Sequence, residues 1–240
     1  MEKPVIDVAI VAWPVSPARL EYFRRLVDSM QRLLTASRHE MRFVVSIGSE
    51  KDPNRKWCGP ELVEYIEELG MKYQWRTRPV EVLGYSMNET VALCSNPYIL
   101  LVQDDAVAES AVDISDGVDL MEDRPDIDAI RYGWSMHPRL TISTKPFQPG
   151  WEQIVLGGRW PFSDNVHLRR ASFVEKFGAY TETTSHGQSE RDMIGKVRAN
   201  NALILTAGSV PSFRNGGVEP ACFRDGNRAK LLKRLREEGK

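Results

Sequence analysis

Three consecutive polar residues, Gln103-Asp104-Asp105, follow an apolar run that extends from Tyr98 to Val102. An apolar run of this kind is typical of a strand that is buried on both faces of a sheet. The two carboxylates then lie at the carboxyl end of the strand, where open α/β sheets bind their ligands. Adjacent acids repel each other unless a positive charge lies beside them. The pattern therefore favours a divalent metal that carries a diphosphate.

The first hundred residues alternate between strand patterns and helix patterns. Pro17 follows a candidate cap, Ser16, and Gly70 ends a later apolar helical stripe. We expect strands over residues 5–12, 43–47, 73–75 and 98–102, and helices over 17–34, 60–69 and 87–95. This order predicts a mostly parallel sheet with helices on both of its faces.

The second half of the chain has a less regular pattern. We expect a strand over 127–132, a hairpin or long loops over 140–160, helices over 171–177 and 188–200, a strand over 203–206 and a helix over 228–238. No linker divides the sequence, so we predict one domain over residues 1–240. Its parts are a nucleotide-binding half (1–105), an acceptor half (106–223) and a basic C-terminal helix (224–240).

Composition places the chain among ordinary globular proteins. Its 240 residues are 42% hydrophobic and 27% charged, and the formal net charge is −1. A global basic field of the kind that binds nucleic acid is therefore absent. The charge is uneven, because residues 104–128 hold ten acids and one Arg, whereas 224–240 hold seven bases and three acids. The basic segment is either a solvated helix face or a contact for phosphate or a polymer.

Cysteine usage and hydropathy bear on where the protein works. Cys58, Cys94 and Cys222 are odd in number and far apart, which predicts neither a disulfide framework nor a zinc site. The apolar stretch 5–13 is short and is interrupted by Asp7, so it reads as a strand and not as a membrane span. We expect a cytoplasmic protein.

Four segments in order resemble the motifs of GT-A fold glycosyltransferases, close to the large family-two group. They cover roughly residues 5 to 200 and are the opening strand and helix, Gly84-Tyr85-Ser86-Met87-Asn88, the strand that ends at Asp105, and the stretch from Asn165 to Met193. The resemblance implies a Rossmann-like GT-A domain. It also implies a metal-dependent, inverting, hexosyltransferase-like enzyme that moves a sugar from a nucleotide-sugar donor to a hydroxyl acceptor.

The resemblance assigns roles to the acidic motif. Asp105 would bind Mn²⁺ or Mg²⁺ together with the donor's phosphates, and Asp104 would hold ribose hydroxyls or a metal-bound water. His186 would be a further metal ligand, although a lone loop histidine is more often solvated. Gln103 stands where the family usually has a carboxylate, and a neutral amide can bond a ribose or a base but brings no charge to a metal.

Other donor-side contacts also follow from the resemblance. Ser86 and Asn88 could contact the donor, or Ser86 could simply cap a helix whose start faces phosphate. Asn165 would contact the donor sugar. Arg169 and Arg170 would reach the diphosphate, or would be surface charges. Glu50 or Asp52 would do part of the base recognition, because the usual acidic segment after the second strand is replaced by residues 48–52.

A second acidic motif, Ser189-Glu190-Arg191-Asp192, precedes the helical pattern near residue 190. The plain interpretation is a helix start, because acids in the first turn favour the helix dipole and Ser189 could be the cap. The resemblance instead implies a catalytic carboxylate. Direct displacement at a sugar carbon needs a base that takes the acceptor's proton. That base would be Glu190, with Asp192 as its substitute or supporting partner.

Two other functional classes stay open. A nucleotidyltransferase on a similar fold would carry a Gly-rich, basic loop after the first strand, whereas this chain has Trp13-Pro14-Val15-Ser16-Pro17 there. A non-catalytic nucleotide-sugar-binding protein is favoured only by Gln103. The acceptor could be DNA with hydroxymethylated bases, as in viral systems, since the basic segment and the Arg169-Arg170 pair are compatible with phosphate contact.

Overall fold

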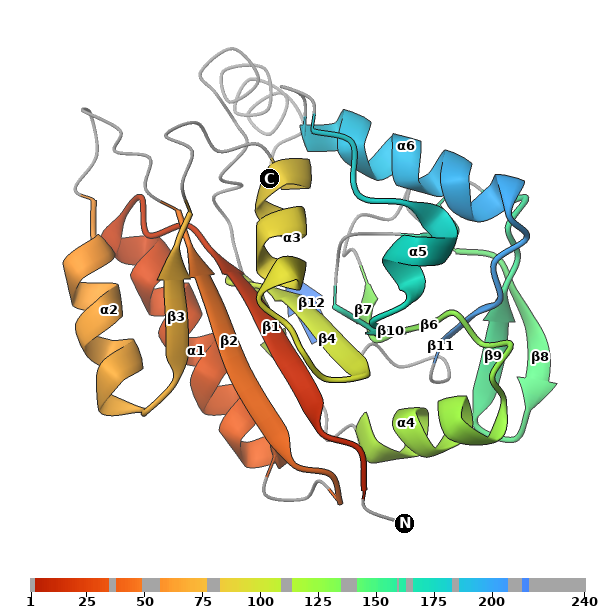
Figure 1. Ribbon diagram of the computed structural model, residues 1–240, viewed down its shortest axis with the longest axis horizontal. Coiled ribbons are helices and arrows are strands. Elements are labelled where there is room, and N and C mark those ends of the chain that lie inside the picture. The colour runs from red at the N-terminus through yellow and green to blue at the C-terminus, as the bar shows by residue number, and fades with distance from the viewer. Residues whose placement is uncertain are drawn as a thin grey trace, which may run out of the picture.

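The computed structural model describes residues 3–34, 38–48, 57–76, 83–108, 114–134, 142–158, 160–162, 166–182, 186–206 and 213–215. A nine-stranded mixed sheet lies at its centre, with the strand order β3-β2-β1-β4-β10-β6-β11-β9-β8 (Figure 1). The strands of the first half are β1 (Ile6–Ala12), β2 (Met41–Ile47), β3 (Lys72–Trp75) and β4 (Tyr98–Gln103). Those of the second half are β6 (Ala129–Arg131), β8 (Thr144–Gln148), β9 (Trp151–Ile154), β10 (His167–Arg170) and β11 (Ile204–Thr206).

Strands β3, β2, β1 and β4 are parallel neighbours, as the alternation of strands and helices predicts. In this register Val11 of β1 lies opposite Ser46 of β2 and Gln103 of β4. The carboxyl ends of the strands therefore meet at one edge of the sheet. Strand β10 then pairs antiparallel with both β4 and β6 and joins the two halves of the sheet.

Helices cover both faces of this sheet, which confirms the predicted α/β architecture. One face packs against α1 (Pro17–Leu34), α2 (Gly59–Glu68) and α4 (Ile114–Asp123). The opposite face packs against α3 (Leu83–Ala92), α5 (Phe173–Phe177) and α6 (His186–Ala199). Among the described residues, no helix is long and apolar enough to cross a membrane.

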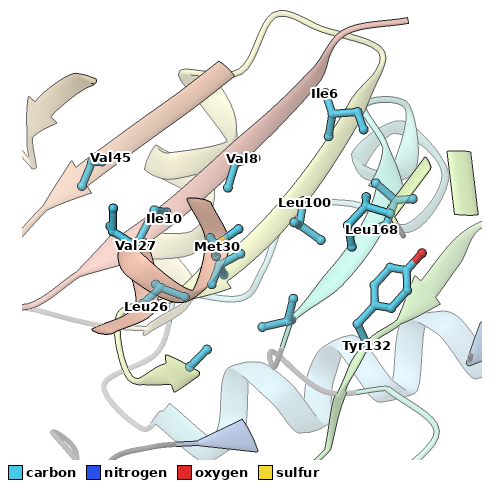
Figure 2. Packing of buried hydrophobic residues seen from close by; sticks show 14 of the residues in the cluster. Ile6, Val8, Ile10, Leu26, Val27, Met30, Val45, Leu100, Tyr132 and Leu168 are labelled. Carbon is cyan, nitrogen blue, oxygen red and sulfur yellow. The ribbon is translucent and has the colours of Figure 1, made fainter. Parts of the chain in front are cut away.

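Apolar side chains alternate between these two cores along the central strands. Val8 and Ile10 of β1 point toward Leu26, Val27 and Met30 of α1 (Figure 2). The intervening Ala9 and Val11 belong to the opposite core. This alternation explains why the strand sequences show no polar face: both faces of a pleated strand are buried here.

A second, three-stranded sheet begins directly after the acidic motif. It consists of β5 (Ala106–Ala108), β12 (Phe213–Asn215) and β7 (Gly133–Trp134), in that order. Since β4 ends at Gln103 and β5 begins at Ala106, Asp104 and Asp105 form the turn between the two sheets. Backbone pairing on both sides of the turn therefore fixes where the two carboxylates lie.

Several boundaries differ from those expected. Helix α3 begins at Leu83 and not at Met87, and α6 begins at His186 and not at Gln188. Helix α4 was not predicted, because its exposed acids hide a buried stripe of Ile114, Val118 and Met121 at helical spacing. The hairpin alternative for residues 140–160 is confirmed by the β8–β9 pair. The helix predicted over 228–238 lies outside the described residues.

Candidate functional site

The carboxyl edge of strands β1 to β4 gathers buried charged residues from several elements. Asp104 and Asp105 come from the turn after β4, Arg19 from the first turn of α1, and Arg76 from the residue after β3. All four are buried, with side chains held by partners from other elements. This is the edge at which sheets of this topology bind ligands.

Arg19 supplies the positive charge beside the two acids. Its Nη2 atom lies 2.5 Å from Asp104 Oδ1 and its Nη1 atom lies 3.2 Å from Asp105 Oδ2. One guanidinium thus bonds to both carboxylates through its planar fork. Arg19 therefore relieves part of the repulsion between these acids, which the sequence prediction had assigned to a metal alone.

Asp104 is engaged through both of its oxygens. Oδ1 accepts from Arg19, and Oδ2 accepts from the Trp13 backbone N–H at 2.7 Å. The pKa of Asp104 is raised to about 7, because burial and the Asp105 charge raise it by more than the Arg19 and Arg76 charges and the Trp13 hydrogen bond lower it. Arg19 is thus what favours the ionised form in this desolvated position. These contacts make Asp104 a support for the motif, and its role as a metal or ribose ligand stays a prediction.

Asp105 differs from Asp104 because only one of its two oxygens accepts a hydrogen bond from a described residue. Its Oδ2 atom accepts from Arg19, whereas its buried Oδ1 atom has no hydrogen-bond partner within the part of the chain that the structure describes. A buried carboxylate oxygen without a partner is costly. A bound cation or a ligand donor at this position would remove that cost.

A divalent cation fits this oxygen chemically, since Mg²⁺ and Mn²⁺ prefer oxygen ligands. No group of three or more His, Cys, Asp or Glu side chains able to hold a metal occurs among the described residues. One carboxylate oxygen cannot complete the coordination of such an ion by itself. A cation here would therefore need further oxygens from water or from a phosphate-bearing ligand.

Arg76 and Trp13 form the neighbouring part of the edge. Arg76 donates to the backbone oxygens of Ala12 and Ser46 at 2.7 and 2.8 Å, and its guanidinium lies 5.2 Å from the centre of the Trp13 ring. The ends of β1 and β2 are thereby tied to the residue that follows β3. Neither Arg76 nor Trp13 was predicted to be part of a site.

Arg19 was also missed, although the sequence held a signal for it. It lies four residues before Phe23 on the helical stripe that includes Leu26 and Met30, so the helical period places an arginine on the buried face of α1. The first turn of a helix also favours acids over bases. A basic residue that is buried there needs an acidic partner, and the acidic motif provides it.

Ser86 and Asn88 lie in α3, whose first turn is at the same edge because it follows β3. Ser86 is fully buried and lies inside the helix, so its predicted role as a helix cap is wrong. The Asn88 amide donates to Tyr180 O at 2.9 Å and accepts from the Tyr180 N–H at 2.9 Å. Asn88 thus ties α3 to the chain segment before α6 and holds that segment in place.

Glu190 and Asp192 lie in the first half of α6, beside the start of α3 (Figure 1). Ser189 donates from Oγ to Thr181 O at 2.5 Å, and a Cβ atom at Gly84 would collide with both of these atoms. Only a glycine at residue 84 allows α3 and α6 to approach so closely. Ser189 is inside the helix and not at its cap, contrary to the plain interpretation of this motif.

The two acids of α6 are two residues apart. Asp192 accepts from the Gln188 amide at 2.5 Å, one helical turn away. Glu190 is half-buried in the same turn as Ser189. His186 is the first residue of α6, and nothing is described of its side chain; Asn165, Glu50 and Asp52 lie outside the described residues.

Arg169 and Arg170 are not gathered at the acidic edge. In β10, Arg170 pairs with Tyr98, at the start of β4, and it donates to the Tyr98 hydroxyl at 2.8 Å and to Met121 O. Arg169 is only 1% exposed and lies against the rings of Phe173 and Tyr180. The prediction that they reach the diphosphate, or else are surface charges, is corrected: Arg169 is buried, Arg170 is half-buried, and β10 pairs both with the first residues of β4, away from Asp105.

Similar solved structures were found for almost the whole chain. TarS 1-349 from S. aureus in complex with UDP-GlcNAc aligns with a TM-score of 0.63 and 14% identity, over 92% of this chain and 60% of that one. The mannosyltransferase PcManGT from Pyrobaculum calidifontis, in complex with GDP-Man and Mn²⁺, aligns with a TM-score of 0.58 and 12% identity, over 98% and 62%.

A third similar structure is CMP:2-keto-3-deoxy-manno-octonic acid synthetase complexed with CTP. It aligns with a TM-score of 0.55 and 12% identity over 98% of this chain and 100% of that chain. No family model and no curated protein sequence matches the chain. The chain spans about 60% of the length of the TarS fragment. At these identities the likeness concerns the fold, and the protein described here has the GT-A fold of glycosyltransferases such as TarS and the mannosyltransferase.

Proposed function

We propose that this protein is a glycosyltransferase that moves a sugar from a nucleotide-sugar donor to a hydroxyl acceptor. The observation that carries the proposal is the buried Oδ1 atom of Asp105, which lies at the carboxyl edge of a GT-A sheet and has no partner among the described residues. The solved neighbours that share the fold include complexes with UDP-GlcNAc and with GDP-Man. A donor diphosphate at this edge would bring its negative charge next to Asp105, which requires a cation between them.

That cation would be Mn²⁺ or Mg²⁺, held by Asp105 Oδ1, and Mn²⁺ is present in the mannosyltransferase neighbour. When bound, it would neutralise the charge that develops on the leaving diphosphate. Asp104 and Arg19 would keep Asp105 in place through their buried contacts. Arg76 and Trp13 would brace the strand ends against which the nucleoside lies.

Glu190 would take the proton of the acceptor hydroxyl. It lies beside the start of α3, and both helices begin at the ligand-binding edge of the sheet. Glu190 is preferred over Asp192, because it directly follows Ser189, whose Oγ atom lies against Gly84 at the start of α3. With a single base and direct displacement, the transfer would invert the configuration at the sugar carbon.

A donor screen tests this function. The protein is incubated with UDP-, GDP-, CMP- and dTDP-sugars, with and without Mn²⁺, and release of the free nucleotide is measured. We expect metal-dependent hydrolysis of at least one donor, and loss of that activity in Asp105→Asn. Asp126→Asn is the matched control, because Asp126 is exposed and pairs with Arg124. Equal turnover in Asp105→Asn and wild type would refute the proposed site, and binding of a donor without any turnover would favour a non-catalytic binding protein.

Nucleotidyl transfer is the second candidate, because the fold of the CTP-complexed synthetase aligns with this chain over 100% of the synthetase and 98% of this chain. Such an enzyme would couple a nucleoside triphosphate to a sugar and release pyrophosphate. Incubation with each of the four nucleoside triphosphates and a panel of sugar acids and sugar phosphates distinguishes the two. Pyrophosphate release would favour this candidate, whereas nucleotide release from a nucleotide sugar favours glycosyl transfer.

DNA as the acceptor stays a proposal with less support than the sequence suggested. Arg169 is buried and Arg170 is bound to Tyr98, so this pair offers no basic surface. The basic segment 224–240 lies outside the described residues. Binding to duplex DNA across a salt series tests the idea, since phosphate contact requires affinity that falls steeply with salt. Absence of binding at low salt would remove DNA from the candidates.

A further inference from the structure

The Arg19 guanidinium places a positive charge directly beside the two carboxylates of the acidic motif. It lies in the first turn of α1, it is 3% exposed, and its Nη atoms contact Asp104 and Asp105 at 2.5 and 3.2 Å. Helix α1 is anchored to β1 by a core that includes Phe23 and Leu26. The helix that carries Arg19 is therefore held against the sheet beside the two carboxylates.

Arg76, another buried arginine at this edge, has hydrogen-bond partners of a different kind, although its charge also lowers the pKa of Asp104. Arg76 donates to the backbone oxygens of Ala12 and Ser46 and to the Ser46 hydroxyl, all of which are neutral. Arg19 instead bonds to two carboxylates, and its positive charge offsets part of their negative charge. Its effect is therefore electrostatic as well as structural.

This charge balance has a consequence for metal binding. Two adjacent carboxylates would attract a divalent cation strongly, whereas one remaining oxygen next to a guanidinium attracts it weakly. Cation binding would then depend on a second source of negative charge and oxygens. The diphosphate of the donor is such a source.

We infer that Arg19 is a positioning residue that makes divalent-cation binding dependent on the donor diphosphate. It holds Asp104 and Asp105 so that only Asp105 Oδ1 faces a ligand, and it lowers the affinity of the acid pair for a cation alone. The cation then binds together with the nucleotide. This inference rests on the proposed function only for the identity of the diphosphate ligand.

Mn²⁺ binding followed by electron paramagnetic resonance tests the inference without any turnover. The titration is made with the full chain, in the absence of nucleotide and with saturating UDP or GDP. For wild type we expect a Kd of about 1 mM or weaker for Mn²⁺ alone. With the nucleotide that the protein binds, we expect Mn²⁺ to bind at least about tenfold more tightly.

The informative variant is Arg19→Gln, which keeps polarity and removes the charge. We expect it to bind Mn²⁺ alone at least about tenfold more tightly than wild type, with a smaller gain on adding nucleotide. Arg19→Lys keeps a charge without the bidentate fork and should fall between the two. Arg25→Gln is the control, because Arg25 lies on the exposed face of α1 and pairs with Glu21. It should leave both affinities unchanged.

Two results would overturn the inference. One is tight Mn²⁺ binding by wild type without nucleotide, which needs no variant to fold. The other is a folded Arg19→Gln or Arg19→Lys protein whose affinity for Mn²⁺ alone equals or falls below that of wild type. Failure of the proposed function looks different: neither UDP, GDP nor any nucleotide sugar would bind, while the effect of Arg19→Gln on Mn²⁺ alone would remain measurable.

Discussion

Two buried aspartates at opposite ends of the same sheet differ in how their oxygens are used. Asp7, near the start of β1, accepts from the Ser95 and Asn96 backbone N–H groups, from the Asn96 side chain and from Arg42, at 2.7 to 2.9 Å. Asp105, in the turn after β4, accepts from Arg19 through one oxygen, and its other buried oxygen has no partner among the described residues.

The difference separates a carboxylate that stabilises the fold from one that can hold a ligand. The four donors around Asp7 satisfy both of its oxygens and tie β1 to the loop before β4. Hydrogen bonds to the charged form lower the pKa of Asp7 in spite of its burial. At Asp105 the fold leaves a buried charge incompletely satisfied, which is the kind of compromise that proteins make at functional sites.

The largest effect on activity is expected for Glu190→Gln, at the proposed ligand-binding edge. The variant keeps the shape of the side chain and removes its ability to take a proton, so kcat should fall by about 10²- to 10⁴-fold. Asp192→Asn should have a smaller effect. Steady-state kinetics with the donor found in the screen measures both, and thermal melting should show no loss of stability. An unchanged kcat in Glu190→Gln would assign the base to another residue.

For Asp7→Asn, by contrast, we expect a large loss of stability and no change in kcat. An amide nitrogen cannot accept the hydrogen bonds that the carboxylate receives, so the free energy of unfolding should fall by about 3 kcal/mol. Urea unfolding measures the change. The kcat of the folded variant should equal that of wild type, and Asp126→Asn, at an exposed position, should be neutral. A stable Asp7→Asn with reduced kcat would reverse the roles proposed for the two ends of the sheet.

The smallest expected effect concerns the pH dependence of stability. The folded pKa of Asp7 lies below its ordinary value of 3.8, so its contribution is fully present above that value and is lost as the pH falls through the folded pKa. The stability difference between wild type and Asp7→Asn should be constant from pH 5 to 7 and should shrink below about pH 4. Urea unfolding across this range checks it; a difference that persists unchanged at pH 2.5 would contradict the account.

Much of the fold followed from local patterns in the sequence. The apolar run 98–102 and the breaks at Pro17 and Gly70 correctly indicated the first strands and helices, because burial on both faces leaves no polar residue in a strand. Helix α4 was not predicted, since its many acids obscure the helical spacing of Ile114, Val118 and Met121. The joining of both halves by antiparallel β10 is a long-range pairing that local patterns do not encode.

The positions of the acidic residues of the candidate site could be predicted from the sequence, and those of its basic residues could not. Asp104 and Asp105 could be located from one strand and the rule for carboxyl ends. Arg19 could not be assigned to them, because the two segments are 85 positions apart and meet only through the parallel pairing of β1 with β4. For the same reason Arg169 and Arg170 were predicted to contact the diphosphate, although the antiparallel direction of β10 places Arg170 beside the start of β4.

The central claim, that Asp105 Oδ1 is the oxygen that meets the ligand, is tested most directly by ligand-induced thermal stabilisation. Wild type, Asp105→Asn and Asp7→Asn are melted with and without Mn²⁺ plus the nucleotide that binds, at about 100 times its Kd. We expect wild type and Asp7→Asn to gain about 5 to 10 °C. Asp105→Asn should gain almost nothing while melting, without ligand, at least as high as wild type. An equal gain in Asp105→Asn and wild type would contradict the account.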